Sequence, residues 1–81
     1  MVAMAGPVDE LRATVAAIPP APVAMEPYLR KVHERAYAIT DADVDALTAA
    51  GCSEDEIFEQ TVAAAIAEGL RRLDRAAEVL A

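Results

Sequence analysis

The residues best suited to acid–base chemistry stand in one short stretch near the middle of the chain. His33 is the single histidine among the 81 residues, and Glu34 follows it directly. Tyr37 lies four residues after His33, which puts the two rings on one face if this stretch is helical. Such side chains transfer protons in catalysis when a fold brings them together. We therefore take His33, Tyr37 and Glu34 as weak catalytic candidates, and a hydrogen-bonding role for His33, at the surface or between subunits, as the favoured interpretation.

The side chains that could ligate a metal ion are too few or wrongly spaced. Asp41, Asp43 and Asp45 alternate like the first ligands of a calcium loop. That loop needs a glycine and a bidentate glutamate where this chain has Ala46 and Cys52. One histidine and one cysteine cannot form a self-contained structural zinc site. We expect no metal and no cofactor, and interpret the aspartates as acidic residues in a first helical turn.

Cys52 lies immediately before a predicted helix start, a position that can favour thiolate reactivity. The chain has no second cysteine to resolve a sulfenic acid or to complete a redox pair. We interpret Cys52 as a small residue at a tight bend.

The last third of the chain is the element that must position the others. Ser53 and Glu56 form a capping box, which predicts a helix start at this point. A wide apolar stripe then recurs at steps of three and four residues. Within it, Thr61, Ala65 and Gly69 form a row of small residues that lets another backbone approach closely. We predict that this stripe contributes to an interface between chains, through Ile57, Phe58, Thr61, Ala65, Gly69 and Leu73.

Three shorter helices precede this long one. The first is predicted from Pro7 to about Ile18, where prolines 19, 20 and 22 begin an extended, stiff spacer. The second is predicted from about Glu26 or Pro27 to about Ala38. Its inward residues are Leu29, Val32, Ala36 and Ile39, flanked by Tyr28 and Tyr37, and its solvated residues are Arg30, Lys31, Glu34 and Arg35. The third starts at Thr40 or Asp41, buries Val44 and Leu47, and ends at Gly51, where a left-handed cap is expected.

These elements predict one all-α domain of about four helices that spans residues 1–81. Residues 1–22 form an arm, a helix and the proline-rich spacer, and residues 23–81 form the helical core. No segment alternates polar and apolar residues as a strand would. A chain of this size buries only about 60% of the surface that its unfolded state exposes, so association is a common remedy. We therefore expect a homo-oligomer or a larger protein partner, with partner chains holding the N-terminal arm.

The net charge of the chain limits the classes of partner that we expect it to bind. The formal net charge is -7 and the sequence pI is about 4.4. Binding to nucleic acid needs clustered cations, and anionic membrane surfaces attract basic segments, so we expect neither partner. The first residues lack the basic region of a secretory signal, and one cysteine allows no internal disulfide. We expect a cytoplasmic protein.

The run from Ala36 to Ile66 resembles the carboxymuconolactone decarboxylase and alkylhydroperoxidase-D-like (AhpD-like) superfamily. The resemblance lies in a helix that ends in Ala-Gly, a Ser-Glu-Asp-Glu-Ile cap and a long alanine-rich helix. It covers about half of the chain. It implies an all-helical, AhpD-like fold that assembles as trimers or hexamers. In the peroxidase branch a cysteine pair and a histidine precede the Ala-Gly bend, at positions equivalent to Ala36, Ile39 and Asp43. None of the three can supply that chemistry, and His33 lies too far upstream.

Our leading hypothesis is a non-catalytic, oligomeric helical subunit or scaffold that associates with itself or with a larger enzyme assembly. The alternative is a divergent carboxymuconolactone decarboxylase-like or alkylhydroperoxidase-like enzyme with an active site at a subunit interface. A third hypothesis is an antitoxin-like or regulatory module.

Overall fold

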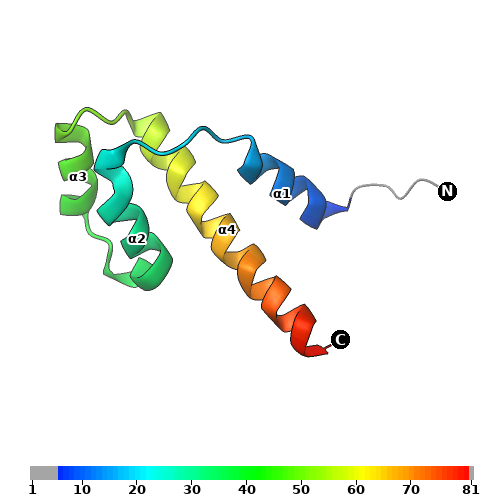
Figure 1. The fold of residues 1–81 in the computed structure, drawn as a ribbon. Helices are drawn as coiled ribbons and strands as arrows, with labels where there is room; N and C mark the ends of the chain where they lie inside the picture. The colour runs from blue at the N-terminus through cyan, green and yellow to red at the C-terminus, as the bar shows by residue number, and fades with distance from the viewer. Residues whose placement is uncertain (1–5, 81) are drawn as a thin grey trace.

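The computed structural model describes residues 6–80 and is built of helices (Figure 1). Its elements are four α-helices and two short 3-10 turns: α1 (Pro7–Ala16), η1 (Val23–Met25), α2 (Glu26–Arg35), η2 (Ala36–Ala38), α3 (Asp41–Ala49) and α4 (Glu54–Leu80). No strand occurs among these residues, so the prediction of an all-α fold of about four helices is confirmed. The predicted contact of the N-terminal arm with partner chains falls on residues 1–5, outside the described range.

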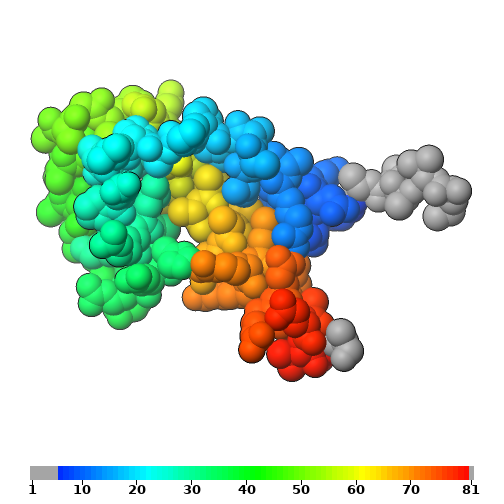
Figure 2. Space-filling view, in the orientation of Figure 1, coloured from blue at the N-terminus to red at the C-terminus, as the bar shows by residue number. Residues whose placement is uncertain are grey.

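Helix α4 is the element on which the others pack. Its 27 residues extend for about 40 Å at the usual rise per residue. Helices α1, α2 and α3 each contact it, with α2 and α3 near its start and α1 further along (Figure 1). The C-terminal end of α4 extends beyond these neighbours, and all of residues 71–80 are exposed (Figure 2).

The predicted helix starts are confirmed by their hydrogen bonds. The Ser53 N–H donates to Oε1 of Glu56 at 3.0 Å, and the Glu56 N–H donates to Oγ of Ser53 at 3.1 Å. At α3 the Thr40 N–H donates to Asp43 at 2.8 Å. Gly51 has a φ of +96°, the conformation expected for the glycine that ends α3. These local patterns fix where α3 and α4 begin and how the chain turns between them.

The core is small and gathers where α2, α3 and the start of α4 meet. Its buried residues are Met25, Tyr28, Val32, Leu47, Cys52 and Ile57. Of these six, Met25 is fully enclosed. The Thr61 hydroxyl donates to the Ile57 carbonyl at 2.6 Å, so the Tyr28 hydroxyl donates to Thr61 Oγ1 at 2.7 Å. This satisfies the polar end of a buried tyrosine.

The second helix differs from its prediction at the C-terminal end. Helix α2 ends at Arg35, and Ala36–Ala38 form the tighter turn η2. Ile39 after this turn is extended and packs against the core, which a continued α-helix would prevent. Tyr37 is 86% exposed instead of flanking the inward face, and Ala36, expected inward, is exposed as well.

Helix α1 lies along α4, with Val15 and Ala16 near Leu70. It ends at Ala16, two residues earlier than predicted, and contains no buried residue. Arg12 donates two hydrogen bonds to the Asp74 carboxylate, at 2.5 and 3.1 Å. The Gln60 side chain donates to the Pro19 carbonyl at 2.8 Å. These exposed contacts fix the position of α1 while adding little stability.

Two glycines allow the same substitution to be compared at two sites. We expect Gly51→Ala to lower the free energy of unfolding by about 1–2 kcal/mol, because a side chain is strained at positive φ. We expect Gly69→Ala to raise it by up to about 1 kcal/mol, because alanine favours the helix and an added Cβ meets no atom within 4 Å. Urea titration followed by circular dichroism at low micromolar concentration measures both. A neutral Gly51→Ala would contradict the left-handed turn.

Candidate functional site

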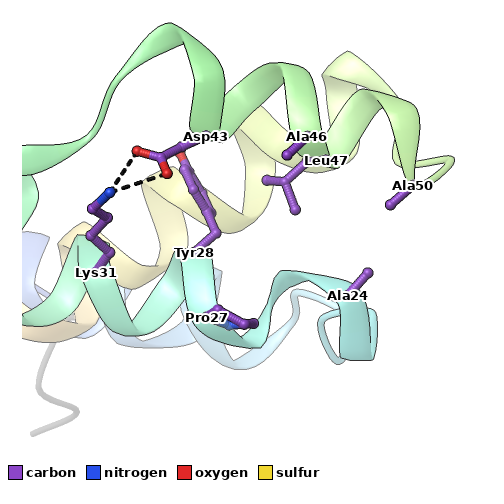
Figure 3. Close-up of a pocket in the computed structure, with 8 residues that line it drawn as sticks. All are labelled: Ala24, Pro27, Tyr28, Lys31, Asp43, Ala46, Leu47 and Ala50. Atoms are coloured by element: carbon purple, nitrogen blue, oxygen red, sulfur yellow. Dashed lines mark hydrogen bonds and ion pairs between the residues drawn. The ribbon is translucent and has the colours of Figure 1, made fainter.

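The first polar cluster closes one end of a hollow between α2 and α3 (Figure 3). The Nζ of Lys31 donates to both carboxylate oxygens of Asp43, at 2.9 and 3.1 Å. Less than a third of each side chain is exposed. The hollow has a volume of about 340 Å³, and Tyr28 and five apolar side chains form the rest of its wall: Ala24, Pro27, Ala46, Leu47 and Ala50. Lys31, predicted to lie in solvent, is thus half-buried and joins α2 to α3.

This ion pair accounts for one of the three aspartates that resemble a calcium loop. The hydrogen bond from Lys31 lowers the pKa of Asp43 below its ordinary value, and the backbone N–H of Thr40 lowers it further. Asp41 and Asp45 are exposed on α3. Within residues 6–80 no group of three or more His, Cys, Asp or Glu side chains is arranged to hold a metal ion.

The second polar cluster joins α2 to the middle of α4 around His33. Its Nδ1 lies 2.7 Å from Oε2 of Glu68. Arg71 contacts both Glu68 and the His33 ring, and Arg72 Nε donates to Oε1 of Glu68 at 3.1 Å. The contacts fit an imidazole that donates from Nδ1 to Glu68 and accepts from Arg71. A hollow of about 420 Å³ lies beside this cluster, between α2 and α4.

Of the three predicted catalytic residues, only His33 belongs to this cluster. His33 is half-exposed and points to α4, while Glu34 and Tyr37 are exposed. The carboxylate that contacts His33 belongs to Glu68, 35 positions later in the chain. Sequence spacing could not identify Glu68, because its approach to His33 depends on how α2 packs on α4.

Cys52 lies in the bend between α3 and α4, as predicted. Its backbone N–H donates to the Leu47 carbonyl at 3.0 Å, and its side chain is buried in the core cluster. A buried thiol packs as a small apolar side chain. Its contacts fit the predicted role at the bend.

A row of exposed apolar residues runs along α4, on the side away from the helices that pack on it. We call it the open face: Phe58, Val62, Ala65, Gly69, Leu73, Ala76 and Leu80, which are all exposed and recur at steps of three and four residues. Phe58 is 72% and Leu73 47% exposed. Exposed apolar residues scattered singly are ordinary, whereas a contiguous row of them marks an interaction site.

The residues predicted to form an interface divide between the core and this face. Ile57 is only 6% exposed and Thr61 is half-buried against Tyr28, so both are taken up within the chain. Phe58, Ala65, Gly69 and Leu73 belong to the open face. The stripe identified in the sequence therefore consists of two adjacent surfaces on α4. The surface with Ile57 and Thr61 is covered by the other helices, and the open face is not.

Charge is distributed unevenly along α4. Residues 54–60 contain four carboxylates and no cation, and residues 71–77 contain three arginines and one aspartate. The acidic end coincides with the positive end of the helix dipole, where carboxylates are favoured. Helix α4 thus runs from an acidic start to a stretch rich in arginine, whose arginines pair with Glu68 and Glu78 of the same chain.

Comparisons with protein-family models, with curated proteins and with solved structures give no match to this chain. The resemblance to the carboxymuconolactone decarboxylase superfamily therefore stays a prediction. Within the described part of the chain, no helix has both the length and the apolar character needed to span a membrane.

The Lys31–Asp43 pair predicts a pH dependence of stability. The pKa of Asp43 is lower in the folded protein than its ordinary value of about 3.9. Its contribution to stability is therefore present above about pH 4 and is lost as the pH falls through the lower, folded-state pKa. We expect the difference in unfolding free energy between wild type and Asp43→Asn to shrink between pH 5 and pH 2 (about two units around this pKa).

The matched control is Asp45→Asn, an exposed aspartate on the same helix. Its effect on the unfolding free energy should be small, because the side chain is exposed. Urea titrations across this pH range measure all three proteins. A difference for Asp43→Asn that stays constant would show that Lys31 does not hold the carboxylate.

Proposed function

We propose that this protein is a non-catalytic helical subunit that acts by association, through the open face of α4. The observation that carries the proposal is the row of exposed apolar side chains from Phe58 to Leu80. Fully burying one large apolar side chain stabilises a complex by about 1.5–3 kcal/mol. The partner would be a further copy of the chain or a larger protein, in an AhpD-like assembly of the kind that the sequence resemblance implies.

The small core supports an associating role. Within residues 6–80 the buried side chains are few, and nine large apolar side chains are exposed. A domain of this size is marginally stable when it folds alone. A partner that covers the open face would remove apolar surface from water and stabilise the helix that holds the other three.

The second candidate is a divergent enzyme of the same superfamily, with its site beside His33. The contact between His33 and Glu68 at the hollow favours it, because a carboxylate can orient an imidazole for proton transfer. Two arginines also bind Glu68, and a thiol pair for peroxide reduction is absent from the sequence. The cluster is accounted for as a structural contact between α2 and α4.

Titration of a small dicarboxylate into ¹⁵N-labelled protein separates the two candidates. Saturable shifts of the His33 and Arg71 signals, absent in His33→Gln, would favour the enzyme. Assembly without any such shift would favour the non-catalytic subunit.

The association proposal predicts the behaviour of a double variant. We expect Phe58→Gln with Leu73→Gln to weaken association at least about a hundredfold, since two exposed apolar groups per chain are lost from the contact. The helical circular dichroism should be retained, because both side chains are exposed in the single chain. Size-exclusion chromatography with light scattering over a concentration series measures the change.

The control for this experiment is Val23→Gln. Val23 is also a large exposed apolar residue, but it lies on η1 and is not part of the open face. Its substitution should leave association unchanged. A wild-type protein that is monomeric at 100 µM (about 1 mg/ml by the size of the chain) and co-purifies with no stoichiometric partner would overturn the proposed function.

A further inference from the structure

The part of the open face from Phe58 to Leu73 has an order of side-chain sizes that is complementary to itself when reversed. Phe58 and Val62 lie towards the start of α4, Ala65 and Gly69 lie in the middle, and Leu73 follows. A second α4 that runs in the opposite direction places Phe58 level with the second copy's Leu73 and Val62 level with its Gly69. Ala65 then meets its own copy. The small residues lie where the two backbones come closest, and large residues lie at both ends.

The charges favour the same direction. In this alignment residues 54–60 of one helix, with four carboxylates and no cation, lie along residues 71–77 of the other, with three arginines and one aspartate; the arginines also pair with Glu68 and Glu78 of their own chain. Two parallel helices in register would instead place the carboxylates beside each other and the arginines beside each other. Like charges in contact oppose association, and opposite charges steer it. Antiparallel helices also bring the unlike ends of their dipoles together.

Gly69 provides an independent indication. Glycine in a helix interior costs about 1 kcal/mol relative to alanine. Within the described chain no atom lies within 4 Å of a Cβ built at this position, so intramolecular packing does not require a glycine there. The antiparallel alignment supplies a neighbour, because Val62 of the second copy lies over this position.

From these three observations we propose that the open face of α4 binds the same face of a second copy of this chain, with the two helices antiparallel about a two-fold axis near Ala65. This inference rests on the proposed function and names its partner. The interface is isologous, so one patch serves both chains and the assembly closes as a dimer. Any larger assembly would be built from this pair through other surfaces.

Cysteine cross-linking tests the direction of the two helices. Each variant carries Cys52→Ala, which removes the native thiol, and one new cysteine at position 58, 65 or 73. A disulfide needs two Cα atoms within about 7 Å, whereas residues 58 and 73 of one helix are about 22 Å apart. We expect Ala65→Cys to form a disulfide dimer with itself under mild oxidation by diamide. We expect Phe58→Cys and Leu73→Cys to form one only when the two variants are mixed.

The outcomes separate the two proposals. A wild-type protein that is monomeric by light scattering but co-purifies with a stoichiometric partner overturns this inference alone. A wild-type protein that is monomeric and co-purifies with no such partner overturns the proposed function as well. A wild-type dimer in which Phe58→Cys cross-links to itself as efficiently as Ala65→Cys shows parallel helices and overturns the inference alone. A dimer in which none of the three positions cross-links has another interface, and it also overturns the inference alone. Circular dichroism confirms that each variant is helical.

A charge reversal provides a second test that needs no cysteine. Arg72→Glu with Arg75→Glu places added carboxylates beside residues 54–60 of the antiparallel partner. We expect the dissociation constant of the dimer to rise at least about tenfold at low salt and the effect to shrink in 0.5 M NaCl, where exposed charges are screened (a Debye length of about 4–5 Å). The control is Ala49→Lys, an exposed position on α3. A charge reversal that leaves the dissociation constant unchanged overturns the antiparallel arrangement.

Discussion

The constraint on which this fold depends is that one helix must serve as the packing surface for all the others. Helices α1, α2 and α3 each contact α4. The core cluster forms where α2, α3 and α4 meet, and Ile57 is the residue that α4 contributes to it. Because apolar surface is removed from water on only some sides of α4, the helix has a covered surface and an open one. The fold leaves no further element of the described chain to cover the open face.

The local patterns predicted helix positions well because the interactions responsible are local. Capping at Ser53 and Thr40 and the turn at Gly51 involve residues within a few positions of each other, so they can be identified from spacing alone. The end of α2 was predicted less accurately. It depends on Ile39, whose position is set by packing against the core, and packing overrides helix propensity.

The polar contacts between helices could not be predicted, because they join distant segments. Lys31 meets Asp43 across two helices, and His33 meets Glu68 from the far half of the chain. The helical periodicity predicted that Lys31 would be solvated, because it lies among the charged positions of its helix. The helical pattern gives the face on which a residue lies but not which neighbour covers that face.

The wide apolar stripe on α4 shows the same limit of the helical pattern, which does not say which part of the stripe is covered. The part that stays exposed bears on function. In the sequence, Ile57 and Phe58 are adjacent members of one stripe. In the structure, Ile57 is buried and Phe58 is largely exposed, because successive residues point about 100° apart around the helix. A helix in a monomeric domain has one such stripe towards the core and polar residues elsewhere.

Residues beyond the edge of the covered stripe of α4 are apolar as well, from Phe58 to Leu80, while the charged residues are concentrated towards the two ends. This arrangement does not help the single chain to fold, since it leaves apolar surface in water. It becomes favourable once a second helix lies along it. The chain then gains the buried apolar area that its own small core does not provide.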